Sequence, residues 1–421
     1  MRMTTLAIDF GTSNSAAALA HAGGVFRIPI EHGNETLPTA VFFPAAGGGG
    51  MRIGAAATEA LIAGEEGRYM RALKSVLGLP LFHESRLIGG RRRTLAEIVT
   101  AFLAEMRQRA ETATGLRFAA ALSGRPVHFH SNDPERDARA EADLRACYLA
   151  AGFARVTFLP EPEAAALASH RLSGPARLGL IVDIGGGTSD FTVFRTQGAR
   201  PQILASHGIR LGGTDFDQAL SLAHAMPLLG LGGQLRREMG AGLLPVPRAP
   251  FVDLSNWAKI PFLYTPETRR LAAEMAKMAV DPVALGRFRT VIEDELGHGL
   301  AFAVEKGKIA ANREGAVAGR IALGEIAPGL GVDLDAAALA DTLAEARAAL
   351  GQAATETLAR ADLAPAAVEE VILVGGSSLL GIVRDEMQAR FPAARLRSAE
   401  AFTAVVDGLA LAAAEADRAA S

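Results

Sequence analysis

Cysteine is almost absent from this sequence of 421 residues, which contains only Cys147. A single thiol excludes a framework of disulfide bonds within the chain, and it fits a protein of a reducing compartment such as the cytosol. Because Cys147 stands in a helix-like stretch, we expect it to pack in the core and not to serve as a nucleophile.

Long apolar runs and an excess of charge are also missing. No run approaches the roughly 20 residues that a membrane-spanning helix needs, and the N-terminus shows no basic stretch followed by an apolar stretch and a cleavage site. The formal net charge is −3 and the isoelectric point is about 6.3, which gives no reason to expect nucleic acid or a membrane as a partner. The Gly-x-x-x-x-Gly-Lys-Ser/Thr pattern of P-loop enzymes does not occur. We therefore expect a soluble, cytoplasmic protein.

Hydrophobic residues make up 49% of the chain, which is long enough to bury two substantial cores. Apolar runs of strand length alternate with helical patterns, such as 95–112 and 335–360, and this alternation predicts an α/β fold. The predicted boundaries are lobe I over 1–172 and 398–421, with a small inserted subdomain over about 38–94, and lobe II over 173–397, with an insertion over about 223–317.

Glycine, by contrast, is abundant, and the stretch Ile181–Asp190 carries three in succession from Gly185 to Gly187. An apolar strand enters this turn and a second strand leaves it, with Asp183 and Asp190 on either side. Without Cβ atoms in the way, backbone N–H groups can converge on phosphate oxygens, and the two carboxylates can hold a hydrated Mg²⁺. The alternative interpretation is an ordinary glycine-rich β-turn.

A similar pattern lies near the N-terminus. There the apolar run Leu6–Ile8 leads to Asp9, then to Gly11, Thr12 and Ser13, and then to a returning apolar run. One such hairpin would be weak evidence for phosphate binding. A duplicated unit of strand, aspartate, glycine turn and strand predicts two similar lobes, each presenting one phosphate-binding hairpin to a shared cleft.

Two further places carry side chains that could take part in catalysis or metal binding. Glu161 stands between Pro160 and Pro162 where a strand gives way to a helix, so its stiff backbone suits a carboxylate that orients a metal-bound water. The alternative is a simple charge at a helix N-terminus. His128 and His130 would share one face of a strand, but no third ligand has a suitable spacing, so we favour a structural or surface role over a metal site.

Taken in order, these motifs resemble the nucleotide-binding part of DnaK-type heat-shock chaperones, in the superfamily of actin, hexokinase and the heat-shock ATPases. The resemblance spans nearly the whole chain. It rests on residues 8–15 (first phosphate motif), 159–167 (first connecting helix), 182–190 (second phosphate motif), 211–217 (the chaperones' Leu-Gly-Gly-x-Asp-Phe-Asp signature) and 374–378 (adenosine motif). It implies a two-lobed actin-like ATPase fold of duplicated ribonuclease H-like domains around a central nucleotide cleft, with ATP or ADP and Mg²⁺ as ligands.

Residue roles follow from the resemblance position by position. The catalytic residues would be Lys74, Glu161, Asp183 and Thr188, with Lys74 meeting the γ-phosphate and the attacking water. Asp9, Asp183 and Glu161 would arrange Mg²⁺, mostly through water. Phosphates, ribose and base would be held by Gly11, Thr12, Ser13, Asn14, Gly185, Gly186, Gly187, Gly212, Gly213, Glu305, Lys308, Gly375, Gly376 and Ser377. Such roles are sensible because phosphoryl transfer depends mainly on positioning and on charge neutralisation.

The chain also differs from the chaperones it resembles. Ile309 and Leu379 stand where arginines usually sandwich the base, and Phe402 stands where a connecting-motif aspartate is usual, which leaves the base specificity open. The sequence ends soon after its last expected helix, over 403–418. We therefore expect no peptide-binding β-sandwich, as in a group of short bacterial DnaK-like proteins.

The resulting prediction is a DnaK-like protein that hydrolyses ATP slowly and opens and closes its lobes with nucleotide state. Its protein partner or client is not identified by the sequence. Three alternatives remain: a nucleotide-sensing interaction module with little hydrolysis, a small-molecule kinase of the same superfamily, and a filament-forming actin-like protein. The signature at 211–217 and Lys74 argue against the kinase, because both resemble the chaperones.

Overall fold

The computed structural model describes residues 4–21, 24–31, 33–45, 50–130, 133–170, 177–197, 200–313, 318–398 and 403–419. The boundary predicted between residues 172 and 173 and the substituted position Phe402 lie outside these described residues.

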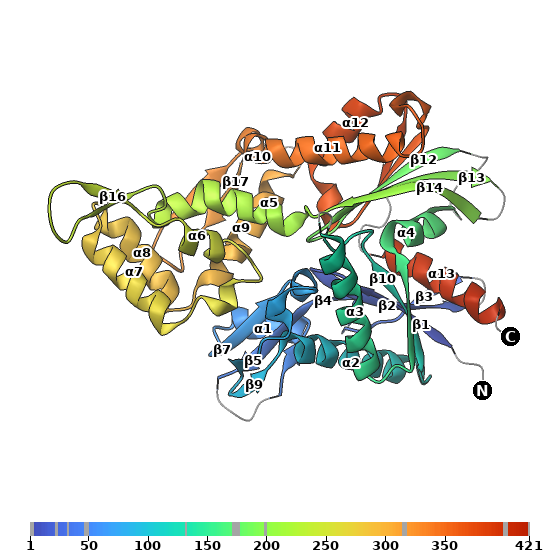
Figure 1. Cartoon of the computed structure of the whole chain (residues 1–421), viewed down its shortest axis with the longest axis horizontal. Helices are drawn as coiled ribbons and strands as arrows, with labels where there is room; N and C mark the ends of the chain where they lie inside the picture. Colours follow the sequence, from blue (N-terminus) through green and yellow to red (C-terminus); the bar gives the residue numbers. More distant parts are fainter. Residues whose placement is uncertain are drawn as a thin grey trace. The chain divides into compact units, whose positions relative to one another are not determined.

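Contacts between residues divide the chain into two compact units, which Figure 1 shows in sequence colours. The first unit comprises Met1–Gly213 and Ala348–Ser421, and the second comprises Thr214–Arg347. The first unit holds both large sheets and both predicted hairpins. The predicted lobes divide the chain at other positions, and they stay a prediction.

The first large sheet has the strand order β11-β10-β1-β2-β3, with β4 also paired to β2. Strands β1 (Thr5–Phe10) and β2 (Asn14–His21) form the first predicted hairpin, and β10 (Ala120–Arg125) runs parallel to β1. The remaining strands are β3 (Gly24–Arg27), β4 (Thr36–Pro38) and β11 (Arg155–Pro160), of which β11 is parallel to β10.

The second large sheet has the order β14-β13-β12-β19-β20. Its strands are β12 (Leu178–Ile184), β13 (Ser189–Gln197), β14 (Arg200–Ile209), β19 (Glu370–Val374) and β20 (Arg395–Ser398). Strands β12 and β13 form the second predicted hairpin, β19 is parallel to β12, and β20 is parallel to β19. Order and direction repeat those of the first sheet strand for strand, which confirms the predicted duplicated α/β fold.

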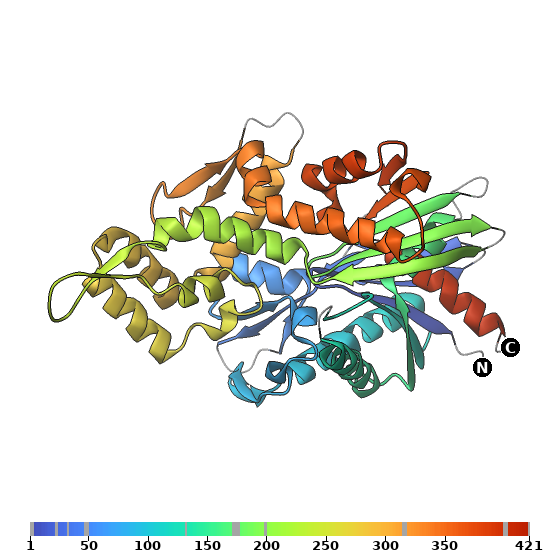
Figure 2. The same cartoon turned by 45° about the horizontal axis from the view of Figure 1, so that its top comes forward.

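Two helices pack against the two large sheets and against each other. Helix α13 (Ala404–Ala419) contacts β1, β2, β3 and β10, whereas α4 (Glu161–His170) contacts β12, β13 and β14 of the second sheet and also β10 and β11 of the first (Figures 1 and 2). The shared core includes Ala16, Leu122, Ala164, Ile181, Phe194, Ile372, Val406 and Leu409. The helices approach closely because Gly408 has no Cβ, which would collide with the backbone of Ala164. Both sheets therefore bury apolar side chains in one core.

The first unit also contains smaller elements around the sheets. They are α1 (Ala55–Ile62), α2 (Leu95–Thr114), α3 (Pro134–Ala150), α12 (Gly381–Arg390), β5 (Ala40–Pro44), β6 (Arg52–Ile53), β7 (Gly67–Arg71), β8 (Arg86–Ile88) and β9 (Arg91–Arg93). Helix α2 matches the predicted apolar spacing and begins at a capping box formed by Thr94 and Glu97. Cys147 lies on α3 and is buried, as predicted for a core residue.

The second unit is mostly helical. Its elements include α6 (Ala249–Leu254), α7 (Pro266–Met278), α8 (Pro282–Glu293), α9 (Gly297–Ala311), α10 (Ala336–Thr342), β15 (Gln234–Arg236), β16 (Leu243–Pro245), β17 (Gly319–Ala322) and β18 (Gly331–Leu334). Two more helices, α5 (Gly213–Leu220) and α11 (Ala344–Ala359), cross the unit boundary along the sequence. The single helix predicted over 335–360 is wrong, because buried Leu343 has φ −97° and ψ 12° and separates α10 from α11.

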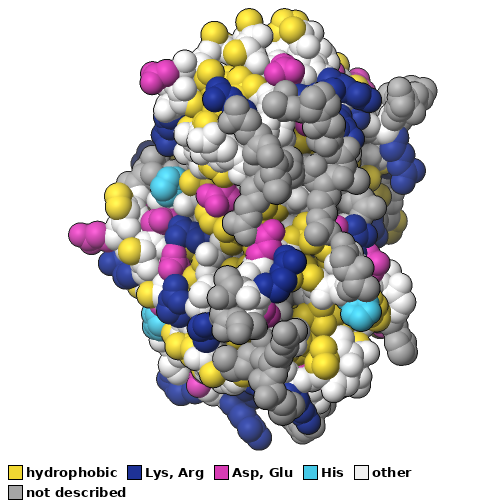
Figure 3. Space-filling view, turned by 90° about the vertical axis from the view of Figure 1, so that its right-hand side faces the viewer, with side chains coloured by type: hydrophobic (Ala, Val, Ile, Leu, Met, Phe, Trp, Pro, Cys, Tyr) yellow, Lys and Arg dark blue, Asp and Glu magenta, His cyan; other side chains and the backbone are white. Residues whose placement is uncertain are grey.

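The described surface agrees with the low net charge. On the face that Figure 3 shows, basic and acidic side chains are interspersed. Among the described helices, none combines the length and the apolar character that crossing a membrane requires.

Candidate functional site

The turns of the two hairpins contact each other. A Cβ atom added to Gly186 would lie 2.7 Å from Ser13 Oγ and 3.0 Å from Thr12 Cβ. The same atom added to Gly187 would lie 3.4 Å from Thr12 Oγ1. Within the first turn, Gly11 is needed because a Cβ there would collide with the carbonyl group of Asn14. The structure thus brings together the two glycine turns that the sequence predicted to face one another.

Other predicted residues hold the second turn in place. The N–H of Gly213 and the hydroxyl of Ser377 both donate to the carbonyl oxygen of Gly185, at 3.0 Å and 3.1 Å. Gly212 packs on the turn so closely that a Cβ there would lie 2.6 Å from the N of Gly187. The predicted glycine motifs at 212–213 and 375–377 therefore meet at the turn 185–187.

Gly375 has a left-handed backbone conformation, which favours glycine. It has φ +81°, and a Cβ there would lie 2.7 Å from Asp183 Oδ1. Gly376 follows as the first residue of a short 3₁₀ helix, Gly376–Leu379. The end of β19 thus lies against the carboxylate of the second hairpin.

A buried ion pair lies at the same turns. Lys74 belongs to the 3₁₀ helix Leu73–Val76, and its Nζ lies 2.5 Å from Oε1 of Glu161, the first residue of α4. Their side chains are only 7% and 12% exposed. Lys74 is therefore buried, whereas most lysine side chains in proteins are exposed.

Three aspartates complete the charged cluster. Asp9 is the last residue but one of β1. Asp183 lies on β12, and Asp190 is paired with Asp183 across the hairpin, on β13. Glu161 acts electrostatically on all three aspartates, as Lys74 does. The structure thus brings together predicted residues from five separate segments.

Burial dominates the acid–base behaviour of this cluster. Burial, followed by the charge of Glu161, raises the pKa of Asp9 to about 7 and that of Asp190 to about 8. The same two causes, together with Asp190, raise the pKa of Asp183 well above its ordinary value. Burial lowers the pKa of Lys74, but Glu161 and Asp9 outweigh it, so the net shift is upward. Lys74 is therefore a permanent cation among carboxylates.

The donor set of the cluster fits a divalent cation. When ionised, the four carboxylates outnumber the single lysine, and a buried excess of negative charge is unfavourable unless protons or a cation offset it. Carboxylate oxygens are the ligands that Mg²⁺ prefers. In the described part of the chain, no group of three or more His, Cys, Asp or Glu side chains is arranged to hold a metal ion directly. Contact with Mg²⁺ through water stays a prediction.

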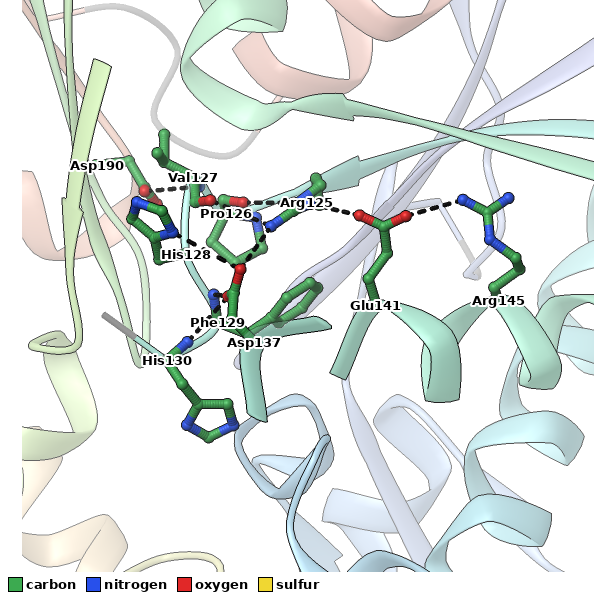
Figure 4. A network of polar contacts seen from close by, with 10 residues as sticks. All are labelled: Arg125, Pro126, Val127, His128, Phe129, His130, Asp137, Glu141, Arg145 and Asp190. Carbon is green, nitrogen blue, oxygen red and sulfur yellow. Dashed lines mark hydrogen bonds and ion pairs between the residues drawn. The ribbon is translucent and has the colours of Figure 1, made fainter. Parts of the chain in front are cut away.

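Asp190 reaches a loop that the sequence did not connect with the hairpin. Its Oδ1 accepts the N–H of Val127 at 2.8 Å, as Figure 4 shows. Arg125 fixes this loop by donating to the carbonyls of Pro126 and Val127, at 3.0 Å and 3.1 Å, and by pairing with Glu141. No sequence signal marked Arg125, because Glu141 lies on α3 and becomes its partner only on folding.

The predicted strand face shared by His128 and His130 is wrong. Strand β10 ends at Arg125 and residues 126–130 contain bends, because Pro126 has no N–H with which to continue the ladder. The Nε2 of His130 lies 2.8 Å from the carbonyl oxygen of Leu77, and Nδ1 of His128 lies 3.6 Å from Asp137 Oδ2. These contacts agree with the structural role that the sequence favoured.

Glu305 and Lys308, which the resemblance to the chaperones assigns to the ribose, lie in the second unit. Lys308 is buried on α9 and pairs with Asp217 at 2.6 Å, and Asp217 also accepts the indole N–H of Trp257 at 3.2 Å. Burial raises the pKa of Asp217, the charge of Lys308 lowers it, and Glu305, one turn earlier on α9, raises it again. Lys308 thus has a polar partner within its own unit, which the sequence did not predict.

Comparison with known proteins gives a consistent family. The family model described as "Hsp70 protein" matches residues 84–226. A chaperone protein HscA homolog of Pseudomonas fluorescens is 30% identical over 369 residues, covering 82% of this chain and 58% of the relative. The heat shock 70 kDa protein BIP3 of Oryza sativa subsp. japonica is 31% identical over 243 residues, covering 51% of this chain and 35% of the relative.

A second HscA homolog, from Pseudomonas paraeruginosa, is 33% identical over 237 residues, covering 52% of this chain and 37% of the relative. The chain thus spans between 35% and 58% of the length of these relatives. Together with the repeated sheet order and the facing glycine hairpins, these similarities show that the chain belongs to the Hsp70 family, with a DnaK-like nucleotide-binding domain of the actin-like ATPase superfamily.

Proposed function

We propose that this protein is a chaperone-like ATP-binding protein of the cytoplasm that binds ATP and ADP with Mg²⁺ and hydrolyses ATP slowly. Lobe I (1–172 and 398–421) and lobe II (173–397) open and close with nucleotide state in this proposal. This motion acts on a protein partner or client.

One observation carries the proposal. Lys74 and Glu161 form a buried ion pair within the same electrostatic cluster as Asp9 and Asp183, beside two glycine turns that face each other. A structural cluster would gain little from burying four carboxylates around one lysine. A site that must hold phosphate and a divalent cation needs this combination of glycine turns and carboxylates.

The chemistry assigned to the site is attack of water on the γ-phosphorus of ATP. The bond between this phosphorus and the bridging oxygen breaks, and ADP leaves with the electron pair. Thr12, Ser13 and the N–H groups of 185–187 hold the β- and γ-phosphates. Lys74 stabilises the charge on the γ-phosphate and orients the water, and Asp183 in its ionised form accepts the proton of that water. Mg²⁺ would neutralise phosphate oxygens and order the surrounding water.

Binding is tested by calorimetric titration of the purified chain with Mg·ATP, Mg·ADP and Mg·GTP. We expect saturable binding of both adenine nucleotides and weaker binding when a chelator removes Mg²⁺. Asp9→Asn should weaken binding because one carboxylate of the cluster is lost. The exposed residue Asp333 provides the control Asp333→Asn, which should leave affinity unchanged. Absence of any heat or shift in melting temperature with all three nucleotides would contradict the proposal.

The same titration decides whether the base is recognised. Ile309 and Leu379 present apolar side chains that are 51% and 52% exposed. Neither side chain can donate a hydrogen bond to a base. Equal affinities for Mg·ATP and Mg·GTP would show that the phosphates dominate binding. Tight binding of Mg·ATP without phosphate release would instead favour the second candidate function, a nucleotide-sensing interaction module.

A further inference from the structure

The segment that carries Lys74 has an unusual backbone. We call residues 72–78 the Lys74 segment. Ala72 at its start has φ +60° and Gly78 at its end has φ +75°, so both ends lie in the left-handed region. A left-handed alanine costs roughly 1–2 kcal/mol, and such a conformation persists only where surrounding contacts hold it. The contacts that hold this segment therefore decide where Lys74 lies.

His130 makes one of the side-chain contacts that hold the segment. Its Nε2 lies 2.8 Å from the carbonyl oxygen of Leu77, and the residue is only 6% exposed. A carbonyl oxygen can only accept, so Nε2 must carry the proton and donate it. Figure 4 shows the ring of His130 turned away from the network around Asp190 and Arg125. His130 thus serves a different part of the site from its loop neighbours.

Arg210 supports both the ring and the segment. One of its guanidinium nitrogens lies 3.4 Å from Nδ1 of His130, and the other donates to the carbonyl oxygen of Ser75 at 3.3 Å. Because Nε2 of His130 carries the proton, Nδ1 is free to accept from Arg210. Asp143 closes the far end by accepting the N–H of Gly78 at 2.9 Å. Three side chains from three separate segments of the chain therefore converge on the Lys74 segment.

The charges around His130 keep it in this neutral form. Burial lowers its pKa, and the positive charges of Arg210 and Arg136 lower it further, while the Leu77 carbonyl and Asp137 act in the opposite direction. The net shift of the His130 pKa is downward. A protonated ring would turn its Nδ1–H toward the guanidinium of Arg210, so the observed contacts require the neutral ring.

We propose that His130, supported by Arg210, is a positioning residue that holds the Lys74 segment and thereby fixes Lys74 beside Glu161. The holding contacts do not depend on any reaction. The catalytic consequence rests on the function proposed above, in which Lys74 orients the attacking water. The hydrogen bonds of His130 and Arg210 go to the backbone carbonyls of Leu77 and Ser75 and not to the carboxylates of the cluster. Their effect on the chemistry therefore passes through the backbone of residues 75–77.

The test compares three variants of the full chain. His130→Leu removes both ring contacts, whereas His130→Gln keeps an N–H donor near the position of Nε2 and can restore the bond to Leu77. The matched control is His21→Leu, at an exposed position on β2. Hydrogen exchange is measured on peptides covering the Lys74 segment, in which the amides of Ser75 and Leu77 bond to Ala72 and Lys74. Turnover is measured on the same samples.

For His130→Leu we expect exchange in the Lys74 segment to rise about tenfold, because the segment opens more often. We expect kcat to fall about tenfold with KM changed less than twofold, because Lys74 is misplaced while the phosphate turns stay intact. His130→Gln should recover at least half of both effects, and His21→Leu should match the unsubstituted chain.

The two proposals fail in distinguishable ways. Unchanged exchange in the Lys74 segment of His130→Leu overturns the positioning role whether or not the protein hydrolyses ATP. Faster exchange with no turnover in the unsubstituted chain supports the holding role and counts against the proposed hydrolysis. Faster exchange with unchanged kcat overturns the link between this segment and catalysis.

Discussion

Asp190 is the residue whose charge state changes most plainly with pH. Burial and the charge of Glu161 raise its pKa to about 8, so the folded, nucleotide-free protein keeps it protonated at neutral pH. The unfolded chain ionises it near its ordinary value of 3.8. The unfolded state therefore binds fewer protons between these values, and the free energy of unfolding falls as pH rises from about 4 to about 8.

We therefore predict that Asp190→Asn weakens this pH dependence. The amide oxygen of asparagine can still accept the N–H of Val127, so the main contact of the side chain is preserved. The melting temperature, measured without Mg²⁺ or nucleotide from pH 5 to pH 8, should fall about 2–4 °C less in the variant than in the unsubstituted chain. Identical slopes would show that the Asp190 carboxyl is not neutralised by folding.

Residue chemistry was predictable only where a motif fixed the neighbours. Asp9 and Asp183 each follow an apolar strand and precede a glycine turn, so their place at the turns could be read from the sequence. Lys74, considered alone, would have been a surface lysine. Its burial depends on Glu161, which lies far away in sequence and meets it only after folding. For His130 the sequence favoured a structural or surface role over a metal site, but it could not name the partner, because that partner is a backbone carbonyl that no side-chain pattern reveals.

At the scale of elements, the facing turns make a sharp steric prediction. A methyl group on Gly186 would lie 2.7 Å from Ser13 Oγ and 3.0 Å from Thr12 Cβ, so these side chains or the turns that carry them would have to shift. We expect Gly186→Ala to lower the free energy of unfolding by about 1–3 kcal/mol, the usual effect of overpacking. Urea unfolding without nucleotide measures this change.

Gly187→Ala is the matched control in the same turn. Its added methyl group would make only an ordinary contact, at 3.4 Å from Thr12 Oγ1. We expect its unfolding free energy to stay within about 0.5 kcal/mol of the unsubstituted chain, as for substitutions without a steric cause. Equal losses for both variants would contradict the described approach of the turns.

The errors in predicting elements have local physical causes. The continuous helix expected over 335–360 breaks at Leu343, where neither glycine nor proline signals a break. Tertiary packing decides it, because Leu343 is fully buried. The strand expected to continue through His128 ends instead at Arg125, and there the following proline was a usable signal.

At the scale of the whole molecule, the duplication was the strongest inference from sequence. Two strand–aspartate–glycine hairpins predicted a duplicated fold with two similar lobes, and both large sheets have the same order and the same strand directions. The role of the two central helices could not be predicted in the same way. Their contact depends on Gly408 meeting Ala164, a pair that no periodicity connects.

The second unit contains a tryptophan that can be used to test nucleotide binding. Trp257 is the only tryptophan of the chain, and its indole N–H donates to Asp217, the partner of Lys308. If Lys308 binds ribose, as we propose, its bond to Asp217 shifts and the environment of the indole changes. We predict a saturable change in tryptophan emission on titration with Mg·ADP.

Lys308→Ala should abolish this emission change, whereas Lys277→Ala, at an exposed position on α7, should preserve it. A full emission change in Lys308→Ala would contradict the proposed ribose contact. Calorimetry on the same variant separates loss of the signal from loss of binding.

The central claim, that the facing hairpins and the buried Lys74 form a site for ATP hydrolysis, is tested most directly by phosphate release from Mg·ATP. We predict slow turnover by the unsubstituted chain and a loss of about 10²-fold or more in Lys74→Ala, the usual effect of removing a group that stabilises the transition state. Lys277→Ala should retain full turnover. Equal phosphate release by Lys74→Ala and the unsubstituted chain would contradict the claim.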